Sequence, residues 1–316
     1  MAFQTMCLIS GTANLPLARE IASRAKLRLA ETTVKRFSDG EIFAQIEENV
    51  RGSDVFVIQP TCPPVNDNLM ELLILIDALK RASVSSITAV VPYYGYARQD
   101  RKVSPRTPIS AKLVADLLQA AGVSRMVALD LHAGQIQGFF DVPFDNLYGL
   151  EVLTSHVKDR LEGPPVVVSP DAGGVLRAAA FAKRLGAGLA IIDKRRAKPN
   201  ESAAMHIIGE VDGADCIIVD DMVDTAGTLT NGAQALLDAG ARRVLAAATH
   251  GVLSGPAIER LQASDLERLI VTDTLPVSQE KRERGRIDVV SCARLLAEAI
   301  KRIHTGDSVS GLFADQ

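Results

Sequence analysis

The stretch CIIVDDMVDTAGTL, residues 216–229, sets an apolar run directly against two adjacent carboxylates. The run from Cys216 to Val219 is apolar throughout, which is typical of a strand that is covered on both faces of a parallel sheet. In open α/β sheets, ligands bind beyond the carboxyl ends of the strands. The stretch therefore predicts a buried parallel strand with a polar binding site at its end.

The loop DTAGT, residues 224–228, has the composition of a phosphate-binding loop. Ala226 and Gly227 leave room for the backbone to approach a ligand closely, and consecutive N–H groups at the start of a helix attract an anion. Thr225 and Thr228 add hydroxyl donors. We therefore expect this loop to hold a phosphate group.

The carboxylates beside this loop need a different ligand group, because like charges repel. Asp220, Asp221 and Asp224 suit the hydroxyls of a sugar, or a cation. A sugar phosphate meets both demands, with its phosphate in the loop and its diol on Asp220 and Asp221. The alternative is a helix N-cap cluster whose acids are merely solvated.

Apolar, β-branched runs recur along the chain and alternate with amphipathic stretches. Because these runs are continuous, they predict strands of a mainly parallel sheet, and hence an α/β fold. Helices are expected at residues 67–82 and 226–239, the second ending before Gly240. The expected strands are residues 54–59, 86–94, 125–131, 165–170, 189–193, 216–221, 243–250 and 269–274.

The chain also resembles itself. LISGTANLPLAREIASR (8–24) is similar to VVSPDAGGVLRAAAFAKR (167–184), and GSDVFVIQPT (52–61) is similar to GADCIIVDDM (213–222). This repeat predicts a duplicated unit, although similar α/β units can also converge on such patterns. The halves differ at the strand end, because only the second half carries the acidic pair and the polar loop.

Length and composition agree with two globular domains. The chain has 316 residues, of which 47% are hydrophobic and 23% charged. We expect domains at residues 1–148 and 149–302, with residues 303–316 packing back on the first. The four cysteines are scattered and are interpreted as small buried side chains in a reducing compartment.

Charge and hydropathy exclude some classes of partner. The net charge is −3, so no overall field attracts nucleic acid or anionic lipid. No apolar run approaches the roughly 18 residues that a membrane span needs. We therefore expect a cytoplasmic protein that binds neither nucleic acid nor membrane.

The motif VDDMVDTAGTL resembles the ribose 5-phosphate motif of the type I phosphoribosyltransferase fold, which phosphoribosyltransferases share with ribose-phosphate pyrophosphokinases. Seven further blocks, in order along the chain, resemble the pyrophosphokinase family. They are residues 36–42, 93–102, 130–146, 169–174, 193–196, 249–257 and 307–313. The resemblance implies two duplicated phosphoribosyltransferase-like domains, each with a mainly parallel central sheet flanked by helices.

The resemblance also implies the reaction. The pyrophosphoryl group of ATP is transferred to the 1-hydroxyl of ribose 5-phosphate, which gives phosphoribosyl pyrophosphate and AMP for nucleotide biosynthesis. Mg²⁺ is the implied cofactor. Two alternatives remain: a phosphoribosyltransferase, and a non-catalytic regulatory homologue of the same family.

ATP must be held without a Walker A loop, because the chain contains no Gly-Lys pair. Without the resemblance, residues 37–41 are a surface turn and residues 98–102 a solvated charge run. The family contacts ATP at both blocks, the first one reaching the site of a neighbouring subunit. The implied ATP-binding residues are Phe37, Asp39, Gly40, Glu41, Arg98, Gln99 and Asp100.

The remaining site residues are likewise implied by the resemblance. His132 and Asp171 are the metal contacts, although a lone histidine is more often structural and is a less usual Mg²⁺ ligand than Asp171. Lys194 and Arg196 are the catalytic cations of a basic loop that would otherwise be read as solvated. The ribose 5-phosphate site comprises Arg196, Asp220, Asp221, Asp224, Thr225, Ala226, Gly227 and Thr228.

Regulation and assembly follow from the family in the same way. Inorganic phosphate and ADP are the implied effectors, bound at a subunit interface. The implied assembly is a homo-oligomer, a hexamer built from dimers. The expected effector-binding residues are Arg51, Arg106, Ser308 and Ser310.

Overall fold

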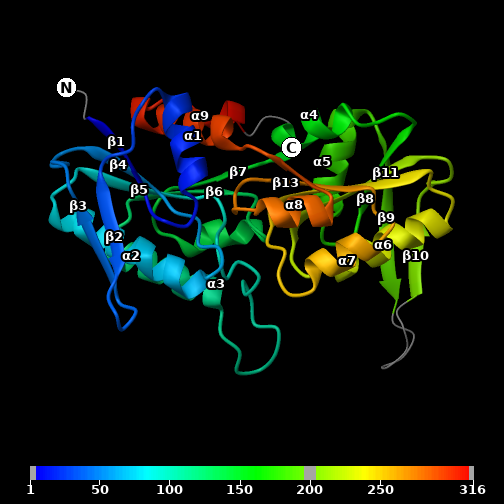
Figure 1. Cartoon of the computed structure of the whole chain (residues 1–316), viewed down its shortest axis with the longest axis horizontal. Helices are drawn as coiled ribbons and strands as arrows, with labels where there is room; N and C mark the ends of the chain where they lie inside the picture. Colours follow the sequence, from blue (N-terminus) through cyan, green and yellow to red (C-terminus); the bar gives the residue numbers. More distant parts are fainter. Residues whose placement is uncertain (1–4, 196–203, 313–316) are drawn as a thin grey trace. The chain divides into compact units, whose positions relative to one another are not determined.

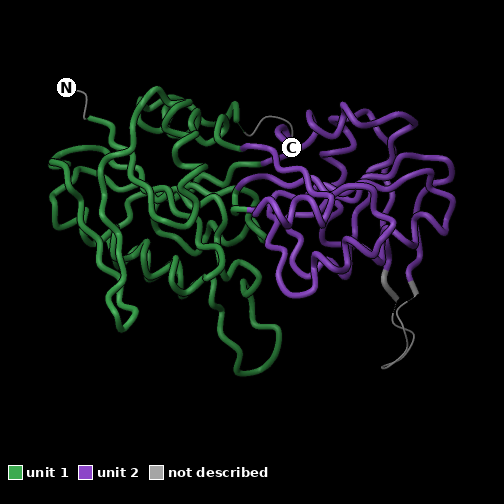
Figure 2. Tube along the Cα trace, in the orientation of Figure 1, with its two compact units in different colours: residues 1–148, 274–276, 292–314 green, residues 149–273, 277–291, 315–316 purple. Residues whose placement is uncertain are grey.

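The structure is a computed structural model that describes residues 5–195 and 204–312 of the chain. The chain divides into two compact units, and each is described by itself (Figures 1 and 2). Unit 1 comprises residues 1–148, 274–276 and 292–314, and unit 2 comprises residues 149–273, 277–291 and 315–316. The chain thus returns to unit 1 briefly at residues 274–276 and again at Cys292, whereas the sequence suggests a return at residue 303.

Unit 1 is built on a five-stranded parallel sheet with the strand order β1-β4-β5-β6-β7. Its strands are β1 (Met6–Ser10), β4 (Asp54–Ile58), β5 (Ser86–Val91), β6 (Arg125–Leu129) and β7 (Phe144–Leu147). Both faces are covered, which is why these strands are mostly apolar. One face carries α1 (Leu15–Ala25) and α9 (Ala293–Thr305), and the other carries α2 (Val65–Arg81) and α3 (Ser110–Ala121). Helices α1 and α9 lie side by side although they stand at opposite ends of the sequence (Figure 1).

Unit 2 is built on a seven-stranded sheet with the order β10-β9-β8-β11-β12-β13-β14, in which only β10 is antiparallel. One face carries α4 (Leu150–Lys158) and α5 (Val175–Leu185). The other carries α6 (Gly227–Asp238) and α7 (Ala257–Ala263), and α8 (Gln279–Gly285) lies beside α7 and β14. The strands are β8 (Pro165–Ser169), β9 (Gly188–Arg195), β10 (Ala204–Ile208), β11 (Asp215–Val223), β12 (Arg243–Gly251), β13 (Arg268–Thr272) and β14 (Ile287–Val290).

The predicted fold class is confirmed, and one strand end is corrected. Strand β11 continues to Val223 because Met222 and Val223 still pair with His250 and Gly251 of β12. The acidic pair, expected as the last two residues of a strand at 216–221, is therefore followed by two further strand residues. The hairpin of β2 (Thr32–Arg36) and β3 (Ile42–Ile46), and the short strands β7, β10 and β14, lie outside the predicted strands. These are edge or separate strands that do not form continuous apolar runs.

The two units repeat one order of elements, as the internal resemblance predicts. Each runs strand, helix, antiparallel hairpin, strand, helix and then further parallel strands. The hairpin β2–β3 of unit 1 corresponds to the hairpin β9–β10 of unit 2. In unit 2 this hairpin joins the main sheet through β8, whereas in unit 1 it forms a sheet of its own.

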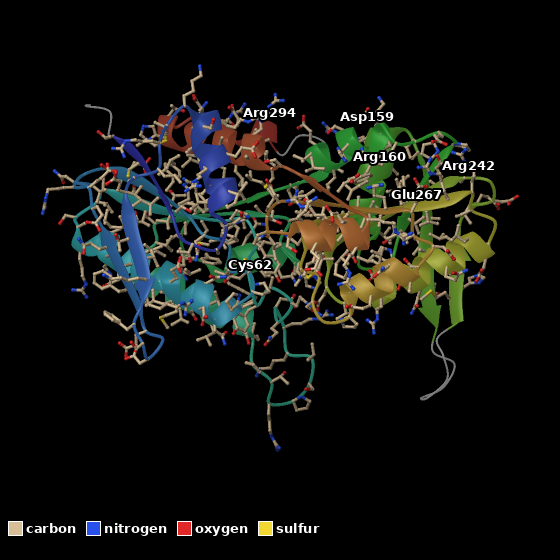
Figure 3. All side chains as sticks on the ribbon, viewed as in Figure 1. Cys62, Asp159, Arg160, Arg242, Glu267 and Arg294 are labelled. Atoms are coloured by element: carbon tan, nitrogen blue, oxygen red, sulfur yellow. The ribbon has the colours of Figure 1, made fainter. Side chains whose placement is uncertain are left out.

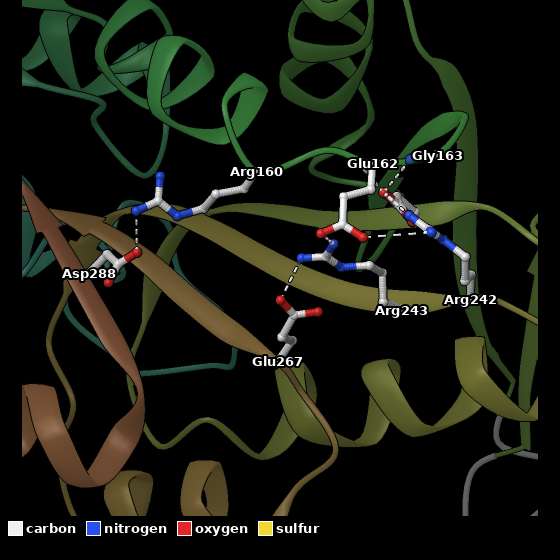
Figure 4. A network of polar contacts seen from close by, with 8 residues as sticks. Arg160, Glu162, Gly163, Arg242, Arg243, Glu267 and Asp288 are labelled. Atoms are coloured by element: carbon white, nitrogen blue, oxygen red, sulfur yellow. Dashed lines mark hydrogen bonds and ion pairs between the residues drawn. The ribbon is translucent and has the colours of Figure 1, made fainter.

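An ion pair between a buried carboxylate and a partly exposed arginine fixes the start of the central strand of unit 2 (Figure 4). The Asp215 carboxylate is fully buried and receives the Arg242 guanidinium at 2.8 Å on each oxygen. Its Oδ2 also accepts the backbone N–H groups of Glu162 and Gly163, each at 2.9 Å. Burial alone raises the pKa of this carboxyl, but these hydrogen bonds and the guanidinium outweigh burial and hold the pKa below its usual value.

The ion pairs continue along this edge of unit 2, where Figure 3 places Arg160, Arg242 and Glu267. Arg243 pairs with Glu162 at 3.1 Å and with Glu267 at 2.5 Å. Arg160 pairs with Asp288 at 2.8 Å, and Arg268 reaches the other oxygen of that carboxylate at 2.9 Å. These pairs join the starts of β11, β12, β13 and β14 at the edge opposite the acidic pair.

Unit 1 anchors the corresponding strand through a histidine instead of an arginine. Asp54 opens β4 as Asp215 opens β11, and its Oδ2 lies 2.8 Å from Nδ1 of His304 in α9. Its other oxygen accepts the Ser86 hydroxyl. Helix α9 is thereby attached to the edge of the sheet as well as to its face.

The cysteines behave as the sequence predicts. Cys62, Cys216 and Cys292 are buried, Cys7 is half-buried, and none of the four forms a disulfide bond. Burial raises the pKa of Cys62, which lies in unit 1 (Figure 3), to about 11 and that of Cys216 to about 12. Within the part of the chain that the structure describes, none of the helices combines the length and hydrophobicity of a membrane span.

Replacing Arg242 by methionine should lower the free energy of unfolding by about 2 kcal/mol, because it removes the counter-charge and two hydrogen bonds of a buried carboxylate. Chemical denaturation followed by circular dichroism measures this loss. Arg284→Met is the control, since Arg284 pairs only with exposed acids, and it should cost less than about 1 kcal/mol. Equal stability of the two variants would contradict the role given to the pair of Asp215 and Arg242.

Candidate active site

The acidic pair lies at the carboxyl edge of unit 2 and has a cationic neighbour. Asp221 is buried, while the Asp220 side chain is one-third exposed and its Oδ1 accepts the Asp221 N–H at 2.8 Å. Nη1 of Arg177, on α5, lies 3.7 Å from Asp220 and 3.6 Å from Asp221. Sequence reasoning missed Arg177. It belongs to the helix that follows the SPDAGG block. Its place in the repeated segment 167–184 is the sequence feature that could have identified it.

The single guanidinium does not fully compensate the two carboxylates. Burial raises the pKa of Asp220, and the neighbouring Asp221 raises it further, while Arg177 acts in the opposite direction. The pKa of Asp220 consequently reaches about 8. A carboxyl group with this pKa is largely protonated at neutral pH, so it can donate a hydrogen bond as well as accept one.

The loop 224–228 has the geometry expected of an anion cradle. Ala226 adopts the left-handed conformation, with φ 58° and ψ 0°, and caps α6 without a side-chain hydrogen bond to the helix. Thr225 and Thr228 are exposed. The first N–H groups of α6 are therefore capped by no side chain, and two hydroxyls stand beside them.

The SPDAGG block lies next to the acidic pair, because β8 and β11 are neighbouring parallel strands. Asp171 is exposed, and its Oδ1 accepts the Gly174 N–H at 3.0 Å. The Ser169 hydroxyl donates to the Asp171 carbonyl at 2.7 Å and closes the turn. The turn holds one carboxylate oxygen at the same sheet edge as Asp220.

The predicted catalytic cations lie at the hairpin of β9 and β10. The backbone of Lys194 belongs to β9, where it pairs with Met205 of β10. Strand β9 runs parallel to β8 and continues past its end, so Lys194 stands at the same edge as the acidic pair. The side chain of Lys194, and the whole of Arg196, lie outside the described residues.

The first predicted ATP block is the tip of the hairpin β2–β3. Phe37 is 52% exposed and packs its ring edge-on against Phe43, with centroids 6.0 Å apart. Asp39 accepts the Glu41 N–H at 3.0 Å, and Gly40 turns the chain with φ 94°. The aromatic ring and both acids are thus presented to solvent on a defined turn.

The second ATP block and His132 follow neighbouring strands of unit 1, β5 and β6. Arg98 and Gln99 are exposed, and Gln99 accepts the Ser110 hydroxyl at 2.6 Å. Asp100 accepts the side-chain amide of Gln135 at 2.7 Å, which connects this block to the segment that carries the exposed His132. Both lie at the carboxyl edge of their sheet, as a nucleotide site requires.

Beyond β1 and β4, the same edge of unit 1 is filled by its own side chain. Glu71 of α2 is 2% exposed and accepts the Thr12 N–H at 2.5 Å, the Thr12 hydroxyl at 2.7 Å and the Gln59 amide at 3.0 Å. Gln59 takes the place of Asp220 in the repeat and in turn accepts the Ala13 N–H at 3.1 Å. A carboxylate of the chain thus satisfies the polar groups at the ends of β1 and β4, where unit 2 carries the SPDAGG turn and the acidic pair.

Comparison with known proteins identifies the family. The N-terminal domain of ribose phosphate pyrophosphokinase matches residues 6–122, and the phosphoribosyl synthetase-associated domain matches residues 193–314. The chain is 58% identical over 309 residues to the ribose-phosphate pyrophosphokinase of Bordetella parapertussis, covering 98% of this chain and 100% of the relative. It is 52% identical over 316 residues to that of Nitrosomonas europaea, with both chains covered in full. The chain belongs to the ribose-phosphate pyrophosphokinase family.

A solved structure agrees with this assignment. The crystal structure of phosphoribosylpyrophosphate synthetase from Mycobacterium smegmatis matches with a TM-score of 0.91 and 44% identity, covering 96% of this chain and 100% of that one. The predicted family, its fold and its enzyme class, a transferase of nucleotide biosynthesis, are confirmed. The individual site residues stay predictions.

The metal contacts expected for a ribose-phosphate pyrophosphokinase are distributed between the units. Within residues 5–195 and 204–312, no three His, Cys, Asp or Glu side chains are grouped to hold a metal ion. Asp171 offers an exposed oxygen in unit 2, and His132 offers a ring nitrogen in unit 1. The oxygen fits Mg²⁺, which usually takes one or two carboxylates and completes its shell with water and substrate phosphates.

The expected effector residues all lie in unit 1. Ser308 accepts the Ser310 N–H at 3.2 Å, and the Ser308 carbonyl accepts Arg302 at 3.1 Å. Arg51 and Arg106 are exposed, and Arg106 has φ 65°. Among the described residues, the contacts found do not join either arginine to the serines.

Asp220 should make the ligand-free enzyme less stable as the pH rises. Its pKa is about 8 when folded against an ordinary 3.8, so the stabilisation by its proton is complete below about pH 4 and is lost as the pH approaches 8. The unfolding temperature of the wild type, measured by calorimetry, should therefore fall relative to that of Asp220→Asn between about pH 5 and pH 8. Asp238→Asn, an exposed change on α6, should follow the wild type. Parallel profiles for all three proteins would exclude the raised pKa.

Proposed function

We propose that this chain transfers the β,γ-pyrophosphoryl group of ATP to the 1-hydroxyl of ribose 5-phosphate and releases AMP. The observation that carries the proposal is the pairing of a side-chain-uncapped helix start at Ala226 with the acidic pair Asp220 and Asp221. The loop binds the 5-phosphate through backbone N–H groups and the hydroxyls of Thr225 and Thr228. The carboxylates bind the ring hydroxyls.

The sugar is oriented by this division of its polar groups. Asp220 and Asp221 accept hydrogen bonds from the 2- and 3-hydroxyls, and Arg177 holds both carboxylates in place. Asp224 contributes a further acceptor beside the loop. With both ends of the sugar held, the 1-hydroxyl is directed at the phosphorus it attacks.

ATP is assigned to residues of unit 1. Phe37 stacks on the base, while Asp39 and Glu41 accept its amino group, in the site of a neighbouring subunit, with Gly40 shaping the turn. Arg98 and Gln99 bind the phosphates or the base, and Asp100 keeps the second block in place through Gln135.

The transfer itself needs positioning and cationic donors more than covalent chemistry. The 1-hydroxyl oxygen attacks the β-phosphorus, the bond from that phosphorus to the α-phosphate oxygen breaks, and AMP leaves as the hydroxyl proton is released. Lys194 and Arg196 stabilise the charge on the transferred group, and Arg196 also contacts the sugar phosphate. Asp171 and His132 would hold Mg²⁺, which when bound neutralises phosphate charge and lowers the pKa of the attacking hydroxyl.

Assembly and regulation complete the proposal. The chain forms a homo-oligomer, a hexamer built from dimers, because one subunit completes the ATP site of another. Inorganic phosphate activates and ADP inhibits through Arg51, Arg106, Ser308 and Ser310.

The proposed reaction is tested by its products. ATP, Mg²⁺ and ribose 5-phosphate together should yield AMP, while omission of the sugar should leave only background AMP, as measured by ion-exchange chromatography. Pyrophosphate release from phosphoribosyl pyrophosphate and a nucleobase, without ATP-dependent AMP, would instead indicate a phosphoribosyltransferase.

Lys194→Ala should lower kcat at least about a hundredfold, because one charged donor to the transition state is removed. Binding of ribose 5-phosphate, measured by calorimetry, should change less than about threefold. Lys158→Ala, an exposed change on α4, is the matched control and should keep normal turnover. Unchanged turnover of Lys194→Ala would refute the assigned role.

Asp171→Asn should raise the Mg²⁺ concentration that gives half-maximal activity by about tenfold, since one anionic ligand is lost. Removal of Mg²⁺ with a chelator should abolish AMP formation, and added Mg²⁺ should restore it. Asp159→Asn provides a surface control in the same unit. An Mg²⁺ requirement identical in Asp171→Asn and the wild type would remove Asp171 from the metal site.

A further inference from the structure

The block THGVLSGPA, residues 249–257, takes no part in the chemistry described above, yet it lies against the sugar-phosphate loop. The chain leaves β12 and turns back along the end of β11. The Leu253 N–H donates to the Val223 carbonyl at 3.0 Å, and the Ser254 N–H donates to the Asp224 carbonyl at 3.0 Å. The block therefore extends the pairing of the two strands into the loop.

Arg260 adds a third contact of the same kind. Its Nη1 donates to the Thr225 carbonyl at 3.0 Å from the second turn of α7. The guanidinium passes beside Gly227, where a Cβ atom would stand 3.0 Å from Nη1. The glycine that the sequence assigns to ligand approach thus also makes room for Arg260.

Three consecutive carbonyls of the loop, from Val223 to Thr225, are consequently held on one side. In a trans peptide the C=O and the next N–H point in opposite directions, and the cis bond found among the described residues joins Pro63 to Pro64. The N–H groups of Asp224, Thr225 and Ala226 are therefore turned to the side away from the block. A row of N–H groups on one side is the arrangement that binds phosphate.

The block is itself fixed, so it can act as a support. Leu253 is 2% exposed, and its carbonyl accepts the Lys281 ammonium of α8 at 3.1 Å. The Ser254 hydroxyl donates to the Asp224 carboxylate, and the Ser254 carbonyl accepts the Ala257 N–H that opens α7. These contacts attach the block to α7 and α8, so the block can hold the loop in a fixed position.

We propose that Arg260 and Ser254 are positioning residues for the sugar-phosphate loop. Arg260 orients the peptide between Thr225 and Ala226, and Ser254 orients the Asp224 carboxylate. Both act through the loop on ribose 5-phosphate, without touching ATP. The inference rests on the proposed function of this loop and adds two residues that none of the motifs assigns to sugar binding.

Arg260→Met tests the first residue. The KM for ribose 5-phosphate and its Kd from calorimetry without ATP should rise roughly tenfold, the size expected for one charge-assisted hydrogen bond. The KM for ATP and kcat at saturating sugar should stay within about twofold, because the variant affects sugar binding and not transfer. Arg260→Lys should recover part of the affinity, since lysine keeps the charge and a donor.

Arg284→Met is the matched control, because this arginine of the neighbouring helix α8 pairs only with exposed acids. It should leave all four quantities unchanged. Sugar affinity within twofold of wild type in Arg260→Met would overturn the inference. An equal loss for ATP, or a lowered unfolding temperature, would also overturn it, because either marks a general structural role.

Ser254→Ala tests the second residue in the same assays. It should weaken ribose 5-phosphate binding about threefold to tenfold. Ser264→Ala removes a comparable hydroxyl that caps a carbonyl at the end of α7, and it should bind the sugar normally. An equal effect of the two serine variants would overturn the role of Ser254.

The wild type separates this inference from the proposed function. Sugar-dependent AMP formation by the wild type, with unchanged sugar affinity in both variants, rejects the positioning role and keeps the function. Absence of both sugar binding and sugar-dependent AMP in the wild type rejects the function, and the inference with it.

Discussion

The ion pair between the buried Asp215 carboxylate and Arg242 fixes the strand on which the rest of unit 2 depends. It closes one end of β11, with two backbone N–H groups completing the carboxylate. Because β11 is central and pairs on both sides, its register then sets the position of its other end. That end carries Asp220 and Asp221. Asp215 at the start of β11 is fully hydrogen-bonded and stabilises the strand. The strand can therefore carry Asp220 and Asp221 at its other end, where Arg177 compensates the two carboxylates only in part.

The same plan is used twice with opposite outcomes. In unit 1, Asp54 anchors β4 through His304, but the far end of the strand carries Gln59 and is filled by Glu71. In unit 2 the corresponding edge keeps its acids and a loop whose helix start lacks a side-chain cap. One edge satisfies its polar groups internally, and the other leaves them for a ligand. The physical difference between the two edges is the Glu71 carboxylate, which fills the edge of unit 1 and has no counterpart in the described part of the proposed binding edge of unit 2.

Much of the candidate site could be predicted from the sequence, because the residues that form it are adjacent in the chain. The acidic pair and the loop 224–228 form one continuous stretch, and parallel strands bring the SPDAGG turn beside it by topology alone. The positions of Arg177 and Arg260 at the site could not be predicted from the sequence. Each reaches the site from a helix, and which of many surface arginines does so depends on how that helix packs. The same holds for Glu71, which in sequence is one acid within an amphipathic helix.

The sequence by itself determined the α/β class, the repeat, the family and the stretch that we propose as the sugar-phosphate site. These properties reside in local patterns: continuous apolar runs, a motif and its spacing. Only the tertiary structure decided which charges meet, and so which end of each strand is satisfied. It also decided the direction of the loop's N–H groups, since that direction follows from carbonyl partners at Leu253, Ser254 and Arg260. Hydrogen bonds between segments far apart in the chain depend on packing, which no local pattern encodes.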